Sequence, residues 1–246
     1  MRSGVRSVFA AVTFLTAIPL GRRAAVAPRH LESAALLFPL VGAVVGTLVA
    51  ATAWVASLAF PPMIAGVIGV ACGILVTGAL HVDGLADVAD GVGAALSGGD
   101  PVEAMRDPRL GVFGGTALVL DLLLKISVIA ALAEDGTFPT QVVAAGALGR
   151  VAPIALAAAL PYVGPRHTWM RAVGWRTCVG ASLLAVAIGV VALGAAFPPM
   201  VIVAAAGTAI VGRWAAVRLG GTTGDVFGAA VELSETLALA AALAIA

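Results

Sequence analysis

Residues 81–91 read His81-Val-Asp-Gly-Leu-Ala-Asp-Val-Ala-Asp-Gly91 and lie between long apolar runs, in a chain that is 61% hydrophobic and 11% charged. Three carboxylates, those of Asp83, Asp87 and Asp90, occur within this stretch. If the stretch is helical, each residue advances by about 100°, so the three side chains share a stripe of roughly 60° on one face. Like charges at that spacing repel one another. The stretch therefore indicates a bound cation.

The composition sets the class of protein. Soluble domains average about 45–50% apolar and about 25% charged residues, so this chain belongs to the membrane class. Its 14 Lys and Arg residues against 13 Asp and Glu residues leave a net charge of +1, and we expect no nucleic-acid partner. Cys72 and Cys178 lie in or beside apolar runs, and their spacing is typical neither of a disulfide framework nor of a metal site.

The apolar runs predict an all-α integral membrane protein in a lipid bilayer, with one polytopic domain over residues 1–246 and about seven transmembrane helices. A shorter run over 7–20, closed by Pro19, predicts an interfacial or re-entrant helix in an N-terminal interfacial segment, 1–33. In the first span, Gly42 and Gly46 have the spacing that permits close helix contact. The predicted spans are 34–60, 63–80, 110–133, 140–160, 177–197, 200–217 and 226–246.

Basic residues predict the orientation, because short cytoplasmic loops carry an excess of Lys and Arg. One side of the membrane receives twelve of the 14 basic residues, counting Arg2, Arg6 and Arg213 near span ends. The short loops on the opposite side contain none. We therefore expect the segment 81–109 to be a cytoplasmic catalytic loop. The loops on the basic side are 21–33, 81–109, 161–176 and 218–225.

The residues after the acidic stretch add cations and a further acid. Carboxylate ligands favour a hard ion such as Mg²⁺, which is usually completed by water and substrate phosphate oxygens. Glu103 fits either the third position of a capping box or a further ligand of that metal. Arg106, Asp107 and Arg109 fall in a turn before and after Pro108, where the guanidinium groups can fork onto phosphates. Ordinary membrane-anchor arginines are the alternative.

A glycine-rich turn precedes the last span. Gly221, Thr222, Thr223 and Gly224 can turn backbone N–H groups toward an anion at the start of a helix. Asp225 is either the cap of that helix or a site residue. Seven residues later Glu232 lies on the same helical face, and a carboxylate inside a span usually faces a cavity or a partner.

Three further ionisable groups lie inside predicted spans. Asp121 and Lys125 are four residues apart, so they can neutralise each other. Alternatively, Lys125 and Arg150 line a polar cavity for an anionic substrate. His81, at a span end, is either an interfacial hydrogen-bonding group or part of the site.

Taken together, these motifs resemble the cobalamin synthase family, the adenosylcobinamide-GDP ribazoletransferases, essentially from end to end. Asp121 is not assigned to the family pattern. The motifs that carry the resemblance are Phe14-Leu-Thr-Ala-Ile-Pro19, Phe38-Pro-Leu-Val-Gly42, the stretch 81–91, Arg106-Asp-Pro-Arg-Leu-Gly111, and Gly220-Gly-Thr-Thr-Gly-Asp225 with Glu232.

The resemblance implies a Mg²⁺-dependent transferase in a bacterial cytoplasmic (inner) membrane, with the active site facing the cytoplasm. Such an enzyme joins adenosylcobinamide-GDP to α-ribazole, or to its 5′-phosphate, and releases GMP. It allows a homo-oligomer or a complex with other corrinoid enzymes. In this interpretation Asp83, Asp87 and Asp90 bind the metal. The phosphates are bound by Arg106, Arg109 and the glycine-rich turn, and the chemistry is served by Asp225, Glu232, Lys125 and His81.

Two alternatives compete with this interpretation. A CDP-alcohol phosphotransferase or a membrane prenyltransferase also holds a diphosphate over aspartates, but Asp83-Gly84 lacks the arginine and the aspartate spacing of the former. An ion-coupled transporter would carry polar residues across several spans. The spans 34–60, 63–80, 177–197 and 200–217 are nearly free of charge.

Overall fold

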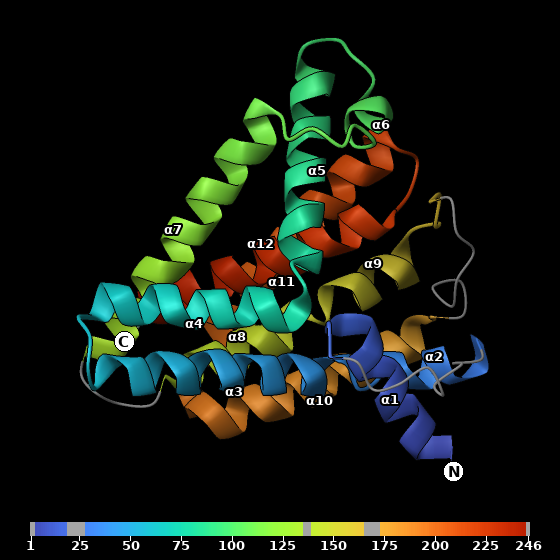
Figure 1. Cartoon of the computed structure of the whole chain (residues 1–246). Coiled ribbons are helices and arrows are strands. Elements are labelled where there is room, and N and C mark those ends of the chain that lie inside the picture. The colour runs from blue at the N-terminus through green and yellow to red at the C-terminus, as the bar shows by residue number, and fades with distance from the viewer. Residues whose placement is uncertain (1–2, 19–27, 135–138, 165–172, 245–246) are drawn as a thin grey trace.

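The computed structural model describes residues 3–18, 28–134, 139–164 and 173–244. These residues form an assembly of helices, and an isolated β-bridge joins Tyr162 to Thr222. In chain order the helices are α1 (Ser3–Leu15), α2 (Pro28–Ala35), α3 (Phe38–Ser57), α4 (Pro62–Thr77), α5 (Leu80–Leu96), α6 (Pro101–Ala104), α7 (Val112–Glu134), α8 (Thr140–Gly149), α9 (Ala152–Ala159), α10 (Trp175–Leu193), η2 (Gly194–Ala196), α11 (Pro198–Arg218) and α12 (Gly224–Leu243) (Figure 1).

The all-α membrane architecture is confirmed. Among the described residues six segments are long and apolar enough to cross a membrane, and α4 with α5 makes a seventh if that bent pair counts as one span. α1 has 13 residues, fewer than the ~20 that a span needs, as expected for the N-terminal helix. Much of the predicted N-terminal segment 1–33, including Arg22 and Arg23, lies outside the described residues. The six segments are α3, α7, α8 with α9, α10, α11 and α12.

The prediction that residues 81–109 form a loop is wrong over most of that length, because Leu80–Leu96 is a helix. The predicted span 63–80 also ends early, at Thr77. Gly78 adopts a left-handed conformation with φ 63°, and the N–H of Ala79 closes the end of α4 on the carbonyl of Ile74. The two helices then meet at 91°, and α5 rises away from α4 beside α7 (Figure 1).

Two other predicted spans are broken near prolines. The run 34–60 divides between α2 and α3, and Pro39 occupies the first turn of α3, where its missing N–H costs nothing. The run 140–160 divides between α8 and α9, just before Pro153. Arg150 lies at this second break. The break therefore decides where one of the few cations inside the spans is held.

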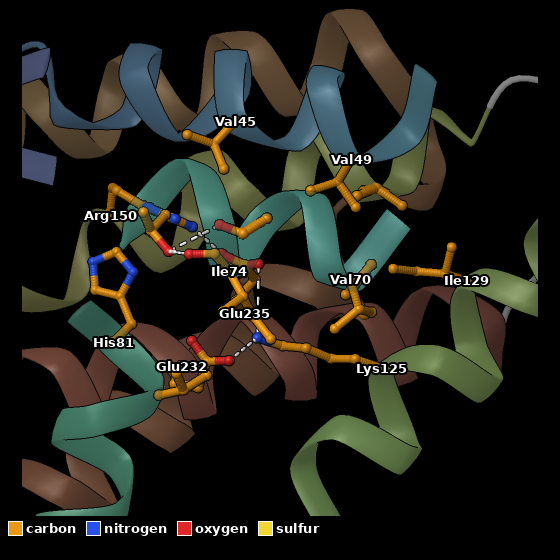
Figure 2. Close-up of a pocket in the computed structure, with 15 residues that line it drawn as sticks. Val45, Val49, Val70, Ile74, His81, Lys125, Ile129, Arg150, Glu232 and Glu235 are labelled. Atoms are coloured by element: carbon orange, nitrogen blue, oxygen red, sulfur yellow. Dashed lines mark hydrogen bonds and ion pairs between the residues drawn. The ribbon is translucent and has the colours of Figure 1, made fainter. Parts of the chain in front are cut away.

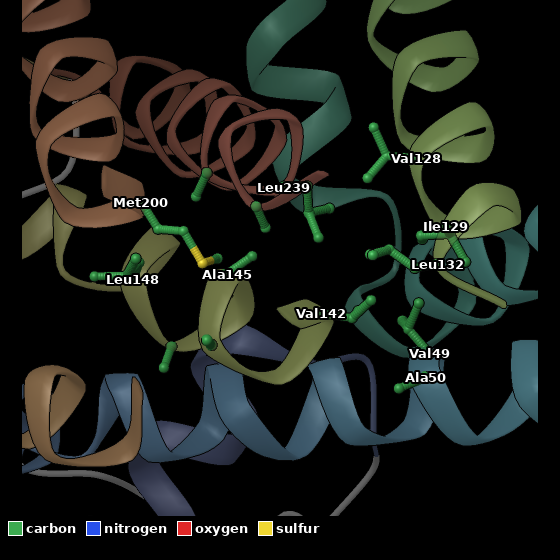
Figure 3. Packing of buried hydrophobic residues seen from close by; sticks show 14 of the residues in the cluster. Val49, Ala50, Val128, Ile129, Leu132, Val142, Ala145, Leu148, Met200 and Leu239 are labelled. Atoms are coloured by element: carbon green, nitrogen blue, oxygen red, sulfur yellow. The ribbon is translucent and has the colours of Figure 1, made fainter. Parts of the chain in front are cut away.

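Small residues bring the helices together. Gly42 and Gly46 of α3 pack directly on the backbone of α8, where a Cβ at Gly46 would lie 2.5 Å from the carbonyl oxygen of Val142. The spacing that predicted close helix contact is thus confirmed. Larger side chains fill the space between α3, α7, α8, α11 and α12, among them Val49, Ile129, Met200 and Leu239 (Figure 3).

Candidate functional site

The acidic stretch forms the face of a helix, as its spacing predicted. Asp83 is exposed, while Asp87 and Asp90 are partly buried. These side chains line a pocket of about 550 Å³, the acidic pocket, together with residues of the turn between α6 and α7. The structure therefore brings together the carboxylates and the turn arginines that the sequence predicted for one site. The turn residues that line the acidic pocket include Met105, Arg106, Asp107, Arg109 and Leu110.

Asp107 and Arg109 hold each other at the mouth of the acidic pocket. The Arg109 side chain donates to both Asp107 carboxylate oxygens, at 2.9 and 2.6 Å, and its backbone N–H donates to Oδ1 at 3.0 Å. These hydrogen bonds lower the pKa of Asp107 to about 2, and they raise the pKa of Arg109. The guanidinium of Arg109 therefore stays charged and oriented, while Arg106 is exposed beside it.

Asp90 has a structural task besides any ligand role. Its carboxylate accepts hydrogen bonds of 2.8 Å from the backbone N–H groups of Gly111 and Gly114, at the start of α7. These are groups that a helix cannot satisfy by itself. Asp90 thus ties α5 to α7, and it fixes the wall of the acidic pocket.

The predicted metal ligands do not form a finished metal site. Glu103 is exposed and is not among the residues that line the acidic pocket. The nearby Asp100 serves as the cap of α6, because it accepts a hydrogen bond of 2.7 Å from the N–H of Val102. Among the described residues, no three His, Cys, Asp or Glu side chains are arranged to hold a metal ion. Mg²⁺ needs only one or two protein carboxylates when water and phosphate oxygens complete its shell. The carboxylate donors of α5 fit that requirement.

The glycine-rich turn before α12 is held by the chain around Tyr162. The N–H of Thr222 donates to Pro161 O at 2.8 Å, and the N–H of Val163 donates to Thr222 O at 2.9 Å. Thr222 is fully buried, and Gly221 packs against the Pro161 carbonyl. The prediction that Thr222 presents its N–H to a phosphate is therefore wrong, because that group is already used within the fold.

The start of α12 leaves other groups of this turn accessible. Thr223 caps the helix by accepting from the N–H of Val226 at 3.3 Å, and its hydroxyl donates to Asp225 at 3.4 Å. Gly224 is exposed. The carboxylate of Asp87 is close enough to that of Asp225 to be repelled by it, as it is by Asp83 and Asp90. Asp225 therefore joins the acidic face of α5 from a neighbouring helix.

The remaining predicted site residues gather in a second place, inside the spans. Lys125 of α7 forms an ion pair with Glu232 of α12, and Arg150 forms one with Glu235. Lys125 also lies 3.8 Å from Asp121, which confirms the predicted neutralising pair, and 3.8 Å from Glu235. These five residues are called the ion network below. His81 points into the same region (Figure 2).

Four residues of the ion network, all except Asp121, line a cavity of about 40 Å³, which has room for a few water molecules at most. Lys125, Arg150 and Glu232 are 6% exposed or less, so they are not presented to a large substrate. Lys125 and Arg150 do line a cavity, but their charges are already paired with Glu232 and Glu235. This pairing is evidence against the alternative in which the two cations bind an anionic substrate there. Apart from His81 and Thr77, the rest of the cavity wall is apolar, and it includes Val45, Val49, Val70, Ile74 and Ile129 (Figure 2).

The family model for cobalamin-5-phosphate synthase matches residues 7–243, nearly the whole chain. This chain belongs to the cobalamin-5-phosphate synthase family. Curated relatives that match this chain bear the name adenosylcobinamide-GDP ribazoletransferase, and three examples follow. That of Pseudomonas aeruginosa PAO1 is 36% identical over 98% of this chain and 99% of the relative. That of Leptothrix cholodnii is 34% identical over 95% and 93%, and that of Klebsiella pneumoniae strain 342 is 34% identical over 97% and 100%. No solved structure gave a significant match.

For this member of the cobalamin-5-phosphate synthase family, the sequence alone assigned no role to two residues that lie near the predicted sites. Tyr162 stacks on Phe227 with ring centroids 6.1 Å apart, next to the turn that carries Asp225. Its loop was notable in the sequence only for its basic charge. Glu235 completes the ion network, and its position three residues after Glu232 was the available signal.

Proposed function

We propose that this enzyme joins adenosylcobinamide-GDP to α-ribazole, or to α-ribazole 5′-phosphate, and releases GMP. The names of relatives that match nearly the full length of the chain support this reaction. The observation that carries it is the acidic pocket of about 550 Å³, whose lining includes both the carboxylates of Asp83 and Asp87 and the guanidinium groups of Arg106 and Arg109. A diphosphate needs cations and a hard-metal site together, and this pocket offers both kinds of group.

The reaction is a displacement at phosphorus. A ribose hydroxyl of the ribazole attacks the phosphorus that is attached to the cobinamide, and the bond from that phosphorus to the bridging oxygen breaks. GMP leaves with the bridging oxygen and its electron pair. Asp225 accepts the proton of the attacking hydroxyl, because it is the carboxylate that a second helix adds beside the acidic face. Glu232 is less suited to this role, since Lys125 already neutralises it.

Asp83 and Asp87 would hold Mg²⁺ together with water and phosphate oxygens. Bound Mg²⁺ supplies neutralisation of the negative charge on the diphosphate. Arg106 and Arg109 bind the phosphates directly, and the hydrogen bonds from Arg109 to Asp107 hold its guanidinium in a fixed orientation for that contact. Asp90 shapes the pocket through its hydrogen bonds to the start of α7.

We further propose that the acidic pocket faces the cytoplasm from a bacterial inner membrane. Arg106 and Arg109, which line this pocket, belong to the group of loops that carries most of the Lys and Arg residues. Short loops rich in Lys and Arg lie on the cytoplasmic side. The soluble substrates then reach the pocket from the cytoplasm.

The test uses purified protein in detergent with adenosylcobinamide-GDP, α-ribazole and Mg²⁺. We expect GMP and a cobalamin product in equal amounts by chromatography, and no product after chelation of the metal. Asp83→Asn should lower the rate at least about 100-fold while the protein stays folded. Glu134→Gln, an exposed acid at the far end of α7, is the matched control. A folded wild-type protein that releases no GMP would overturn the proposal.

A further inference from the structure

α12 carries two sets of functional groups on one face. Asp225 lies in its first turn, and Glu232 and Thr236 follow at offsets of seven and eleven residues, within a stripe of about 40°. A helix moves as a rigid rod, so any contact that sets the depth and rotation of Glu232 also sets those of Asp225. Along the helix axis, Asp225 and Glu232 are about 10 Å apart.

The middle of α12 is fastened on two sides. Glu232 pairs with Lys125 and Thr236 donates to Asp121 at 2.5 Å, both on α7. Glu235 pairs with Arg150, at the break between α8 and α9. The Lys125 and Glu232 side chains are each 8% exposed, and that of Arg150 is 3% exposed. Buried charges cannot remain unpaired without a large cost, so these contacts permit one register of α12.

The fastened region is separate from the acidic pocket. Of the described residues that line this pocket, none belongs to the ion network. Between the two regions α12 crosses α5 at Gly228, where a Cβ would lie 3.1 Å from the carbonyl oxygen of Leu80. A shift of α12 by one residue would move Asp225 by about 1.5 Å and rotate it by about 100°. It would also drive a side chain into α5.

We propose that the ion network is a positioning device that sets the register of α12 against α7 and α8 and so holds Asp225 beside the acidic face of α5. The role of Asp225 rests on the proposed function. Glu232 and Lys125 act through Asp225, and they do not touch the substrate. They are positioning residues, in contrast to the catalytic roles that the sequence predicted for them.

The test compares three variants of one ion pair. Lys125→Met leaves three network carboxylates against Arg150 alone, and we expect kcat to fall at least about 100-fold with KM changed less than about threefold. Glu232→Gln leaves Lys125 with Asp121 and Glu235, and we expect a loss of less than about tenfold. The double variant Lys125→Met/Glu232→Gln keeps the net charge of the network, and we expect it to recover to within about tenfold of wild type.

Leu132→Ala is the matched control, because it opens a cavity in the same helix outside the network. It should lower the melting temperature and leave kcat unchanged. Hydrogen–deuterium exchange of the peptide 220–231 gives a readout that needs no activity: it should rise in Lys125→Met and return in the double variant. If the wild-type protein released no GMP but the variants showed this exchange pattern, the proposed function would be overturned and the positioning role would stand. A folded Glu232→Gln variant, or a folded double variant, that is as inactive as Lys125→Met would overturn the positioning role.

Discussion

Gly84 of α5 and Gly228 of α12 lie in contact where their helices cross, and a Cβ on Gly84 would lie 3.1 Å from the Cα of Gly228. The same Cβ would lie 2.6 Å from the backbone oxygen of Asp225. This crossing therefore carries the first turn of α12 up to the acidic face of α5. Neither helix has all the carboxylates that the proposed site uses.

Gly84→Ala is expected to separate the two helices, because the backbone of α12 cannot yield as a flexible side chain would. We expect at least a tenfold loss of GMP release and a lower melting temperature in detergent, with overpacking costs of about 1–3 kcal/mol. Gly115→Ala in α7 is the matched control, since its Cβ would meet only the side chain of Leu110, with Cδ2 at 3.7 Å and Cγ at 3.9 Å, which is ordinary van der Waals contact. An active Gly84→Ala variant would show that the contact between these helices does not position the site.

Asp83 and Asp90 should respond differently although they share one face. Asp90→Ala leaves the N–H groups of Gly111 and Gly114 without their acceptor, so we expect stability to fall by about 1–3 kcal/mol. Asp83→Ala removes an exposed carboxylate, and we expect activity to fall while stability changes by less than about 0.5 kcal/mol. Thermal unfolding and GMP release, measured on both variants, separate the two roles. Equal loss of stability in both would contradict the assignment.

Asp107 should remain ionised over the working pH range. Its side-chain and backbone hydrogen bonds from Arg109 lower its pKa to about 2, against about 3.9 in an unfolded chain. A lowered pKa means that the contact contributes stability above the unfolded value and loses it as the pH falls through about 2. We therefore expect the KM for adenosylcobinamide-GDP to show no inflection from Asp107 between about pH 5 and about pH 9.

Asp107→Asn should raise that KM at every pH in this range, because Arg109 loses the ionised partner that orients its guanidinium. The expected change is about three- to tenfold, with kcat less affected. An inflection near pH 4–6 that disappears in Asp107→Asn would contradict the low pKa of this group.

Tyr162 should support the glycine-rich turn through its ring. Burial first, and the nearby charge of Asp225 second, raise the pKa of its phenol, so the group stays neutral at working pH. Tyr162→Phe keeps the stack on Phe227 and should keep activity within about threefold, whereas Tyr162→Ala removes a stack worth about 0.5–1.5 kcal/mol and should loosen the turn. Activity and exchange of the peptide 220–231 measure both effects. A defect in Tyr162→Phe equal to that in Tyr162→Ala would assign the role to the hydroxyl.

Much of the molecule could be predicted from the sequence because the signals are local. Composition alone indicates a polytopic membrane protein. The offsets of Asp83, Asp87 and Asp90 predicted a shared helical face, which the structure contains, since helical periodicity depends only on neighbouring residues. The turn with Arg106 and Arg109 follows the acidic helix closely enough in the chain to reach the same pocket. The family was recognisable from motifs that lie in a fixed order.

Only the tertiary structure decided which distant groups meet. Lys125 and Glu232 are 107 residues apart in the chain, and their pairing depends on how α7 packs on α12. Arg150, at the end of α8, meets Glu235 of α12, and Thr222 is buried against Pro161. Residues that look alike as candidates in the sequence therefore have different tasks in the fold. The physical reason is that a buried charge or N–H group must find a partner, and that partner is set by helix packing, which local sequence patterns do not encode.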